Sequence, residues 1–504
     1  MFGFFLNCLD DKAVKLHAGV GYLEIPAQYT TSSSAVFYHE HEWAKKPEYS
    51  SLGHYFCVSG WFIYKGSRNN LAQLAEDLIL FGESVLAEMK MGSFVIYWYN
   101  SDTQVPKVIS DPFGLSSHYI DTTCEYLKLS PSAFFLYDET RHNINLLHQE
   151  ILNHKQHLFG NVTLYDGIVR LDPGCIIDIC KSVKYHQIQP IKHKIEDIGE
   201  VFIEINSYWP QKLKILPISS GLDSRFILAH GQFEYGFTYG PLDSPEILTG
   251  ESYSKEFSHY YSYDFSSVSV HEEERDILDM LSTGVLVPIK LLYSNYRHVS
   301  DHFSHAKVFF DGYLGDVLQR ATYINPKGVI GELFKLFPIC FKLVKFRAKT
   351  LLKLKYRSLS SAAFELVYQD FLARTHGLPL DDLQKVTYYE FIYARGGRYT
   401  VFGSNVLAAQ FFTVVSPFAH IDVFNTFIQQ DFSDGAQYKI MRSLWSKVDK
   451  RFLTRAVESG YKPTTPIILI PFIQLWYRLL FHFIPSRANY GVKLKRELKS
   501  NDRR

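Results

Sequence analysis

The stretch KILPISSGLDSRFILAHG, residues 214–231, places a short polar segment between two apolar runs. The first run ends at Ile218, and the second is Phe226–Ala229. The polar segment contains Ser219, Ser220, Gly221, Asp223 and Ser224. This pattern is typical of a strand followed by a loop and the start of a helix. The free N–H groups at a helix N-terminus attract anions such as phosphate. The segment predicts either a phosphate-binding loop or a plain turn before a capped helix.

Each residue type has a physical use in a phosphate loop. Gly221 allows a close backbone approach, and the serine hydroxyls are hydrogen-bond donors. Asp223 can hold a cation or cap the helix. No Lys follows a glycine here, so this is not a Walker A loop.

Composition limits the class of protein. With 504 residues, 46% apolar and 21% charged, the chain predicts a globular protein of two or three domains. The formal net charge of +1 predicts no nucleic-acid partner. Six cysteines without a CxxC pair argue against zinc and disulfide frameworks and favour reduced thiols.

The first residues, MFGFFLNCLDDK, lack the basic segment of a secretory signal. We therefore expect a cytoplasmic protein.

The pattern changes along the chain. Residues 1–150 are rich in strand-forming residues and turn signals and predict a layered α+β domain, with residues 71–90 at helical spacing. Residues 151–195 read as a linker. From 196 to 504, strand and helix patterns alternate as an open α/β sheet requires.

Two stretches raise the question of membrane contact. Residues 332–357 carry many Lys and Arg and predict either a helical hairpin with a solvated basic face or contact with an anionic membrane. Residues 465–485 are strongly apolar, with Gln474, Arg478 and His482 on one helical face. They predict either a buried helix with one polar edge or an interfacial helix. Peripheral membrane contact and a homodimer stay open.

At SSGLDS the chain resembles the asparagine synthetase family, whose pyrophosphate loop reads SGGxDS. Those enzymes cut ATP between its α and β phosphates and transfer AMP to a carboxylate. The resemblance implies a PP-loop ATP-pyrophosphatase domain over 196–504, with a parallel sheet and a helical C-terminal region. It assigns Ser219, Ser220, Gly221, Asp223 and Ser224 to pyrophosphate. Ser220 stands where Gly is usual, and strain follows if its φ is positive.

Further matches follow in the family's order. FTYGPLDSPE, residues 237–246, resembles the adenosine-binding turn and assigns Thr238 and Gly240 to ATP. FFDGYLGDVL, residues 309–318, resembles the acidic loop G-x-G-x-D-E. The resemblance implies that Gly312 contacts ATP and that Asp316, with Asp223, binds Mg²⁺. Val317 replaces the usual Glu.

Three shorter segments extend the resemblance across most of the chain. VVSPFAHIDVF, residues 414–424, resembles the "PFLD" segment, with His420 at the Asp position. LYDGIVRLDPG, 164–174, resembles the family's linker, and ISDPFGLSSHYI, 109–120, resembles its SD-x-x-G segment.

The N-terminus matches the family's frame but not its glutaminase chemistry. Glutamine-hydrolysing members begin Met-Cys-Gly and use the cysteine thiolate as nucleophile, whereas Phe2 occupies that place here. Cys8 lies in an expected strand and is a poor substitute. Ser59–Ile63 and Met91 replace other glutamine-site positions. The resemblance implies an Ntn-hydrolase-like, glutaminase-like layered sandwich without glutaminase activity.

Tyr313 points to a divergent branch. In β-lactam synthetases, which like lasso-peptide cyclases use an amine of the substrate, a Tyr at this place helps to deprotonate the attacking amine. The alternative is that Tyr313 only packs over the pocket. A cation near the reacting phosphate is also expected, and Arg455, Lys462 and Arg225 are the open candidates.

The sequence therefore predicts an ATP- and Mg²⁺-dependent, AMP-forming ligase. It would adenylate a carboxylate of a small molecule, sugar or peptide and transfer it to ammonia or an amine, with Tyr313 and Asp316 as catalytic residues. The alternative is a non-catalytic nucleotide-binding or scaffold protein in polysaccharide or peptide modification.

Overall fold

The fold is that of a computed structural model. It describes residues 2–16, 20–30, 32–42, 47–178, 183–185, 197–242, 244–269, 271, 273–281, 289–319, 337, 340, 347–436 and 439–483. Most of the basic stretch 332–357 lies outside these residues.

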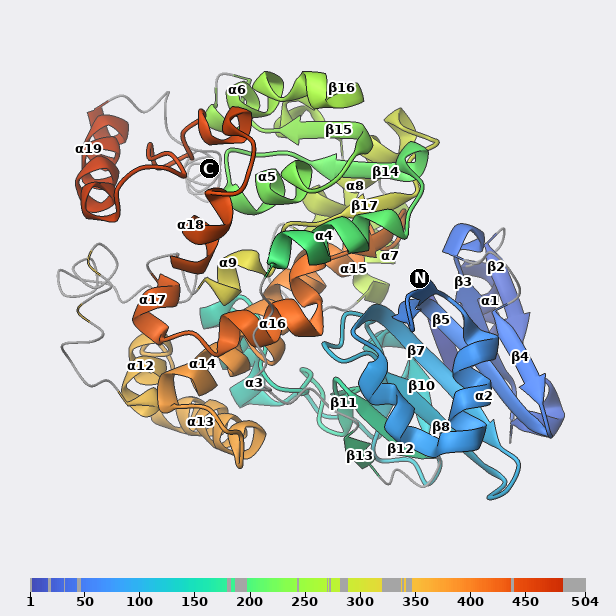
Figure 1. The fold of residues 1–504 in the computed structure, drawn as a ribbon. Coiled ribbons are helices and arrows are strands. Elements are labelled where there is room, and N and C mark those ends of the chain that lie inside the picture. Colours follow the sequence, from blue (N-terminus) through green and yellow to red (C-terminus); the bar gives the residue numbers. More distant parts are fainter. Residues whose placement is uncertain are drawn as a thin grey trace.

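The N-terminal part contains two antiparallel sheets packed face to face, with a helix on each outer face (Figure 1). Side chains from both sheets form the core between them, among them Phe4 and Val36 from one sheet and Cys57 and Val95 from the other. The first sheet has the order β11 (Ile168–Arg170), β9 (Tyr119–Asp121), β10 (Lys128–Ser130), β1 (Gly3–Leu6), β3 (Ser34–Tyr38), β2 (Gly21–Glu24). The second has the order β13 (Val183–Tyr185), β12 (Cys175–Asp178), β8 (Val105–Ser110), β7 (Met91–Asn100), β5 (His54–Tyr64), β4 (Glu48–Ser51), and β6 (Ser67–Arg68) pairs with β5.

Helices complete four layers. Ala13 of α1 (Asp11–Leu16) packs on Phe5 and Phe37 of the first sheet. α2 (Leu71–Phe81) buries its apolar stripe on the second sheet. This helix is shorter than the predicted range 71–90, because Gly82 takes a φ of 71° and ends it. Strands β11 to β13, which fall in the range read as a linker, complete both sheets.

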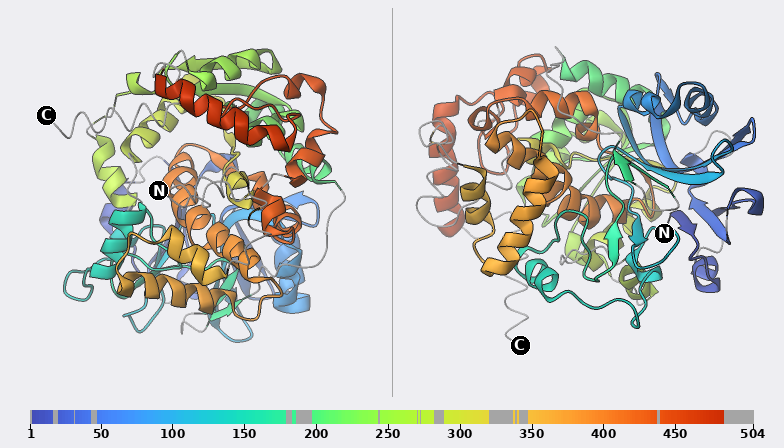
Figure 2. Two further views of the ribbon diagram at one scale, coloured as in Figure 1. Left: turned by 90° about the vertical axis from the view of Figure 1, so that its left-hand side faces the viewer. Right: turned by 90° about the horizontal axis from the view of Figure 1, so that it is seen from below.

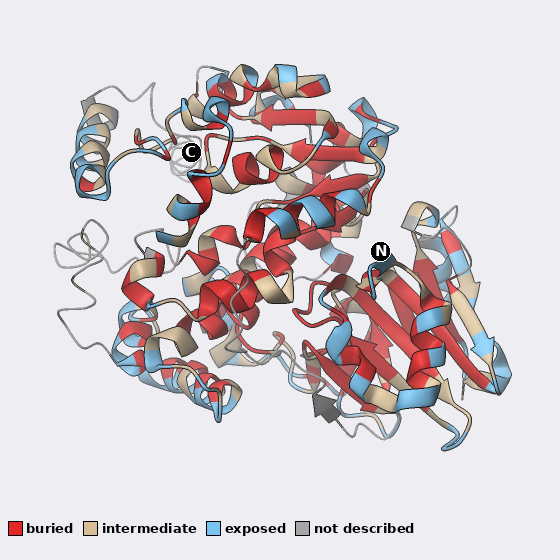
Figure 3. Ribbon diagram, viewed as in Figure 1, coloured by how far each residue is buried: buried red, intermediate tan, exposed pale blue. Residues whose placement is uncertain are grey.

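The second part contains a five-stranded parallel sheet. Its order is β16 (Phe257–Tyr263), β15 (Phe233–Tyr239), β14 (Lys214–Pro217), β17 (Val308–Phe310), β18 (Thr413–Val415). The expected layered α+β N-terminal region and the later parallel sheet with helices are confirmed at this level, and the N-terminal sheets are antiparallel. Strands β14, β17 and β18 are almost entirely buried, whereas the edge strand β16 is partly exposed (Figure 3).

The chain order of these strands creates a switch point beside β14. From β14 the chain moves outward to β15 and β16, and it then returns past β14 to β17. Right-handed crossovers place the two sets of connecting helices on opposite faces, and Figure 1 shows α4 and α5 on the near side and α8 on the far side. Loops at the carboxyl ends of β14 and β17 therefore leave a crevice between them.

The connecting helices are α4 (Ile198–Ser207), α5 (Leu222–Ala229), α6 (Pro245–Ser252), α7 (Glu273–Leu281), α8 (Ile289–His302) and the short α9 (Gly315–Leu318). A helical region lies below the sheet in Figure 1. It includes α3 (Leu146–Lys155), α12 (Ala348–Lys355), α13 (Ser361–Thr375), α14 (Asp382–Ile392), a π-helix (Arg395–Asn405), α15 (Val406–Ala408), α16 (Ile421–Ile428), α17 (Phe432–Ala436) and α18 (Lys439–Trp445).

Buried polar contacts join the two parts. Trp61 Nε1 of β5 donates to the Val414 carbonyl of β18 at 2.9 Å. The Arg398 guanidinium, 1% exposed, donates to the carbonyls of Phe159, Gly160 and Val162. The N-terminal sandwich is therefore fixed to the edge of the parallel sheet and to the helical region.

The last described helix, α19 (Ile470–Phe483), stands at the margin of the molecule, at the left of Figure 1. Figure 2 shows it on the outside in the view from that side. Within the part of the chain that the structure describes, no helix has the length and apolar character needed to cross a bilayer.

Candidate nucleotide site

The loop between β14 and α5 is held by its own side chains. The Gly221 N–H donates to Ser219 Oγ at 3.1 Å, and the Ser219 and Ser224 hydroxyls lie 3.4 Å apart. Ser220 is 2% exposed and its φ is outside the left-handed region, so Ser fits where the resemblance expects Gly. The predicted strand, loop and helix start are all present here.

The loop after β17 packs directly on this loop. A Cβ added to Gly312 would lie 3.0 Å from the Ser224 backbone nitrogen, and one added to Gly315 would lie 2.7 Å from Asp223 Cγ. Only glycine leaves room for this approach. Leu314, at the second glycine of the G-x-G-x-D-E pattern, takes a left-handed φ of 74°, a conformation that costs about 1–2 kcal/mol for most residues.

Two carboxylates meet where these loops touch. Burial, together with the nearby Asp316 carboxylate, raises the pKa of Asp223 to about 8. Gln319 Nε2 donates to Asp223 Oδ1 at 2.7 Å. Among the described residues, no group of three or more His, Cys, Asp or Glu could hold a metal ion by itself. A pair of carboxylates that repel each other still fits Mg²⁺, which proteins bind through one or two carboxylates plus substrate phosphates.

The crevice opens into a cavity of about 530 Å³, within the usual range of ligand pockets of roughly 300–1,000 Å³. Most predicted site residues line it: Ser219, Gly221, Asp223, Ser224, Thr238, Gly312, Tyr313 and Asp316. Ser220 and Gly240 do not line it. Thr238 lines it, but its hydroxyl donates to the Ile218 carbonyl at 2.6 Å and so also holds the loop.

Five further polar residues line the cavity: Tyr239, Glu246, Tyr296, Asp311 and Glu458. Asp311 directly follows β17, a place where the carboxyl-edge rule could have found it. Glu458 comes from the loop after α18, and no local sequence signal brings it here. Burial and the nearby Glu246 raise the pKa of Glu458 to about 7.

Tyr313 and Asp311 form one unit. The Tyr313 N–H donates to Asp311 Oδ1 at 2.8 Å, while Asp311 Oδ2 has no hydrogen-bond partner and the residue is 2% exposed. The pKa of Tyr313 is held well above its usual value, first by the electrostatic effect of the nearby Tyr239 and then by burial. Burial raises the pKa of Asp311 to about 8. At neutral pH the phenol of Tyr313 is therefore protonated, whereas the Asp311 carboxyl gains or loses its proton at about pH 8.

The three candidate cations lie elsewhere. Arg225 is fully buried, and its guanidinium donates to the carbonyls of Gly221 and Arg455. Arg225 therefore fixes the loop to the C-terminal segment. The side chains of Arg455 and Lys462 are exposed. Among the described residues, no Lys, Arg or His lines the cavity.

Two departures from the family pattern have structural explanations. His420 is the N-cap of α16, and its Nδ1 accepts the Asp422 N–H at 3.2 Å. Burial lowers the pKa of His420 to about 4, so the ring is a neutral acceptor, as a capping residue must be. Val317 is fully buried and adds no ligand oxygen.

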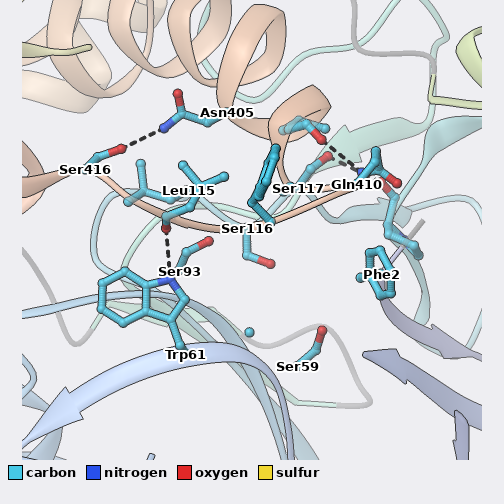
Figure 4. A pocket seen from close by; sticks show the side chains of 16 residues that line it. Phe2, Ser59, Trp61, Ser93, Leu115, Ser116, Ser117, Asn405, Gln410 and Ser416 are labelled. Carbon is cyan, nitrogen blue, oxygen red and sulfur yellow. Dashed lines mark hydrogen bonds between the residues drawn. The ribbon is translucent and has the colours of Figure 1, made fainter. Parts of the chain in front are cut away.

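A second, smaller pocket of about 70 Å³ lies between the two parts of the molecule (Figure 4). Phe2, Ser59 and Trp61 line it from one part, and Asn405, Gln410 and Ser416 line it from the other. Phe2 stacks on His39 with ring centroids 3.5 Å apart. No Cys is among the described residues that line it. Cys8 lies between β1 and α1, and burial raises the pKa of its thiol to about 12.

No protein-family model matches this chain, and no curated protein matches it.

Proposed function

We propose that this protein is an ATP-dependent, AMP-forming ligase, with a PP-loop type ATP-pyrophosphatase domain after an Ntn-hydrolase-like sandwich. One observation carries the proposal. The loop Ser219–Ser224, the facing loop with Asp316 and a cavity of nucleotide size meet at the switch point of a parallel sheet. The resemblance at SSGLDS and DGYLGD supports the same assignment.

The loop residues would bind the β and γ phosphates of ATP. The free N–H groups at the start of α5 and the Ser219 and Ser224 hydroxyls are the donors. Asp223 and Asp316 would hold Mg²⁺, which when bound offsets phosphate charge. This role matters because five carboxyl groups and no described cationic side chain line the cavity.

The reaction has two half-reactions. A substrate carboxylate attacks the α phosphorus and forms an acyl adenylate, and pyrophosphate leaves. An amine then attacks the acyl carbon, loses a proton, and AMP leaves with the carboxyl oxygen. Asp311 is the better proton acceptor, because the pKa of Tyr313 is too high for a base. Tyr313 would orient the amine.

ATP–pyrophosphate exchange with a panel of carboxylates tests this function. The panel comprises aspartate, other amino acids, uronic acids and peptides. Exchange should require Mg²⁺ and should fall by about 100-fold or more in Ser224→Ala and Asp316→Ala. Asp301→Ala, which removes a 73% exposed carboxylate, is the matched control. Exchange that survives both site substitutions would exclude the assignment.

The second candidate is a nucleotide-binding scaffold. The lack of a described basic side chain in the cavity favours it, because adenylyl transfer from ATP to a carboxylate usually uses one. ATP binding without exchange for any carboxylate in the panel would support the scaffold.

A further inference from the structure

The outer face of α19 is apolar. Phe472 and Trp476 are each 60% exposed, and Leu475 and Leu479 are nearly half exposed. They stand at i, i+3, i+4 and i+7, which is one face of a helix. Ile468 and Leu469, just before the helix, extend this surface and are 75% and 48% exposed. Of the two predictions for residues 465–485, the exposed apolar face favours an interfacial helix over a buried one with a polar edge.

The opposite face fixes this orientation. Pro471 is buried, and the Tyr477 ring packs so closely on Gly460 that a Cβ there would lie 2.1 Å from it. Gln474, expected on a polar edge, is half-buried. Phe472 also contacts the Phe337 ring at 6.5 Å between centroids and still remains exposed. The apolar residues therefore face outward because the helix is anchored by its other side (Figure 3).

Positive charges that follow α19 in the sequence, and others on the same side of the molecule, indicate what covers this face. Residues 484–504, which follow the helix in the sequence, carry seven Lys or Arg and two Asp or Glu. Arg347, Lys349, Lys353 and Arg357 are exposed at α12, which lies on the same side of the molecule as α19 in Figure 1. Lys349 also pairs with Glu365 at 3.9 Å. Aromatic and aliphatic residues that are followed in the sequence by a cationic segment match the acyl boundary and the headgroups of an anionic bilayer.

We propose that α19 docks this protein onto an anionic membrane surface. Phe472 and Trp476 insert at the level of the headgroups, and the net positive charge of the sequence that follows α19 favours acidic lipids. The helix lies in the plane of the membrane and does not span it. The proposal is independent of the chemistry assigned to the cavity.

Cosedimentation of the full chain with lipid vesicles tests the proposal. Vesicles of phosphatidylcholine and phosphatidylglycerol in equal parts should bind the protein. Pure phosphatidylcholine should bind it weakly, and added salt should release it. The double variant Phe472→Ser/Trp476→Ser should bind at least about tenfold more weakly, because it loses the inserted side chains.

Phe81→Ser is the matched control, because Phe81 at the end of α2 is 64% exposed and lies in the N-terminal part. It should bind vesicles as the wild type does. An unchanged thermal unfolding of the double variant would show that its fold is intact. Equal binding by the double variant, or no binding by the wild type, would overturn the proposal. It would also be overturned by a dimer in light scattering that Trp476→Ser abolishes, since a second copy would then cover this face.

Discussion

Asp311 and Tyr313 should have different roles in the reaction because their pKa values differ. The pKa of Asp311, near 8, lets its carboxylate accept a proton, whereas the phenol of Tyr313 keeps its own. A residue that acts only on the attacking amine matters for the second half-reaction alone.

Asp311→Asn should therefore retain ATP–pyrophosphate exchange and lose amide formation by about 100-fold or more. In the wild type the rate of amide formation should rise with pH up to about 8, because the base is active when deprotonated. The variant should lack this rise. Measuring the two half-reactions separately across pH checks this, and an equal loss in both would contradict the role.

The protonation of Glu458 should make the stability of the protein depend on pH. Its pKa is about 7 in the folded protein and lower in the unfolded chain. Between about pH 4.5 and 7 the folded state holds a proton that the unfolded state has lost, so stability falls as pH rises.

Asp223 and Asp311, whose pKa values are raised to about 8, contribute to the same fall in stability. Glu458→Gln should therefore remove only the share that Glu458 contributes, a slope of at most about 1.4 kcal/mol per pH unit. Thermal unfolding without ligands, compared at pH 5 and about pH 7.5, measures it. Glu365→Gln, which changes a half-exposed surface carboxylate, should keep the wild-type dependence.

The π-helix Arg395–Asn405 helps to join the two parts of the molecule. The Arg398 guanidinium donates hydrogen bonds to three backbone carbonyls of the segment before β11. Arg398 uses two nitrogens of its guanidinium for these bonds, whereas a Lys carries its donors on one nitrogen and cannot reproduce the same geometry.

Arg398→Lys should lower the free energy of unfolding by about 2–4 kcal/mol. Arg395→Lys is the matched control in the same element, because Arg395 stacks on Tyr399 and is half-buried. It should lose under about 1 kcal/mol. Denaturant unfolding distinguishes the two, and equal losses would contradict the role of Arg398.

The sequence predicts the centre of the molecule well and its margins poorly. The strand–loop–helix at 214–231 and the layered α+β region before a parallel sheet follow from local patterns. Glu458 could not be found in this way, because the fold brings it to the cavity from a loop far along the chain. The sequence does not predict which face of α19 is exposed, because the packing of the helix on Gly460 decides it.

The molecule as a whole can act as the proposed ligase only if its cavity binds ATP together with Mg²⁺. The described residues that line the cavity include five carboxyl groups and no cationic side chain, so the cavity offers no countercharge to free ATP and should accept it only with the metal ion. Calorimetric titration of the full chain with ATP is the most direct measurement. We predict binding in Mg²⁺, none in EDTA, and a loss of at least about tenfold in Asp316→Ala but not in Asp301→Ala. Equal binding in EDTA, or full binding by Asp316→Ala, would contradict the account.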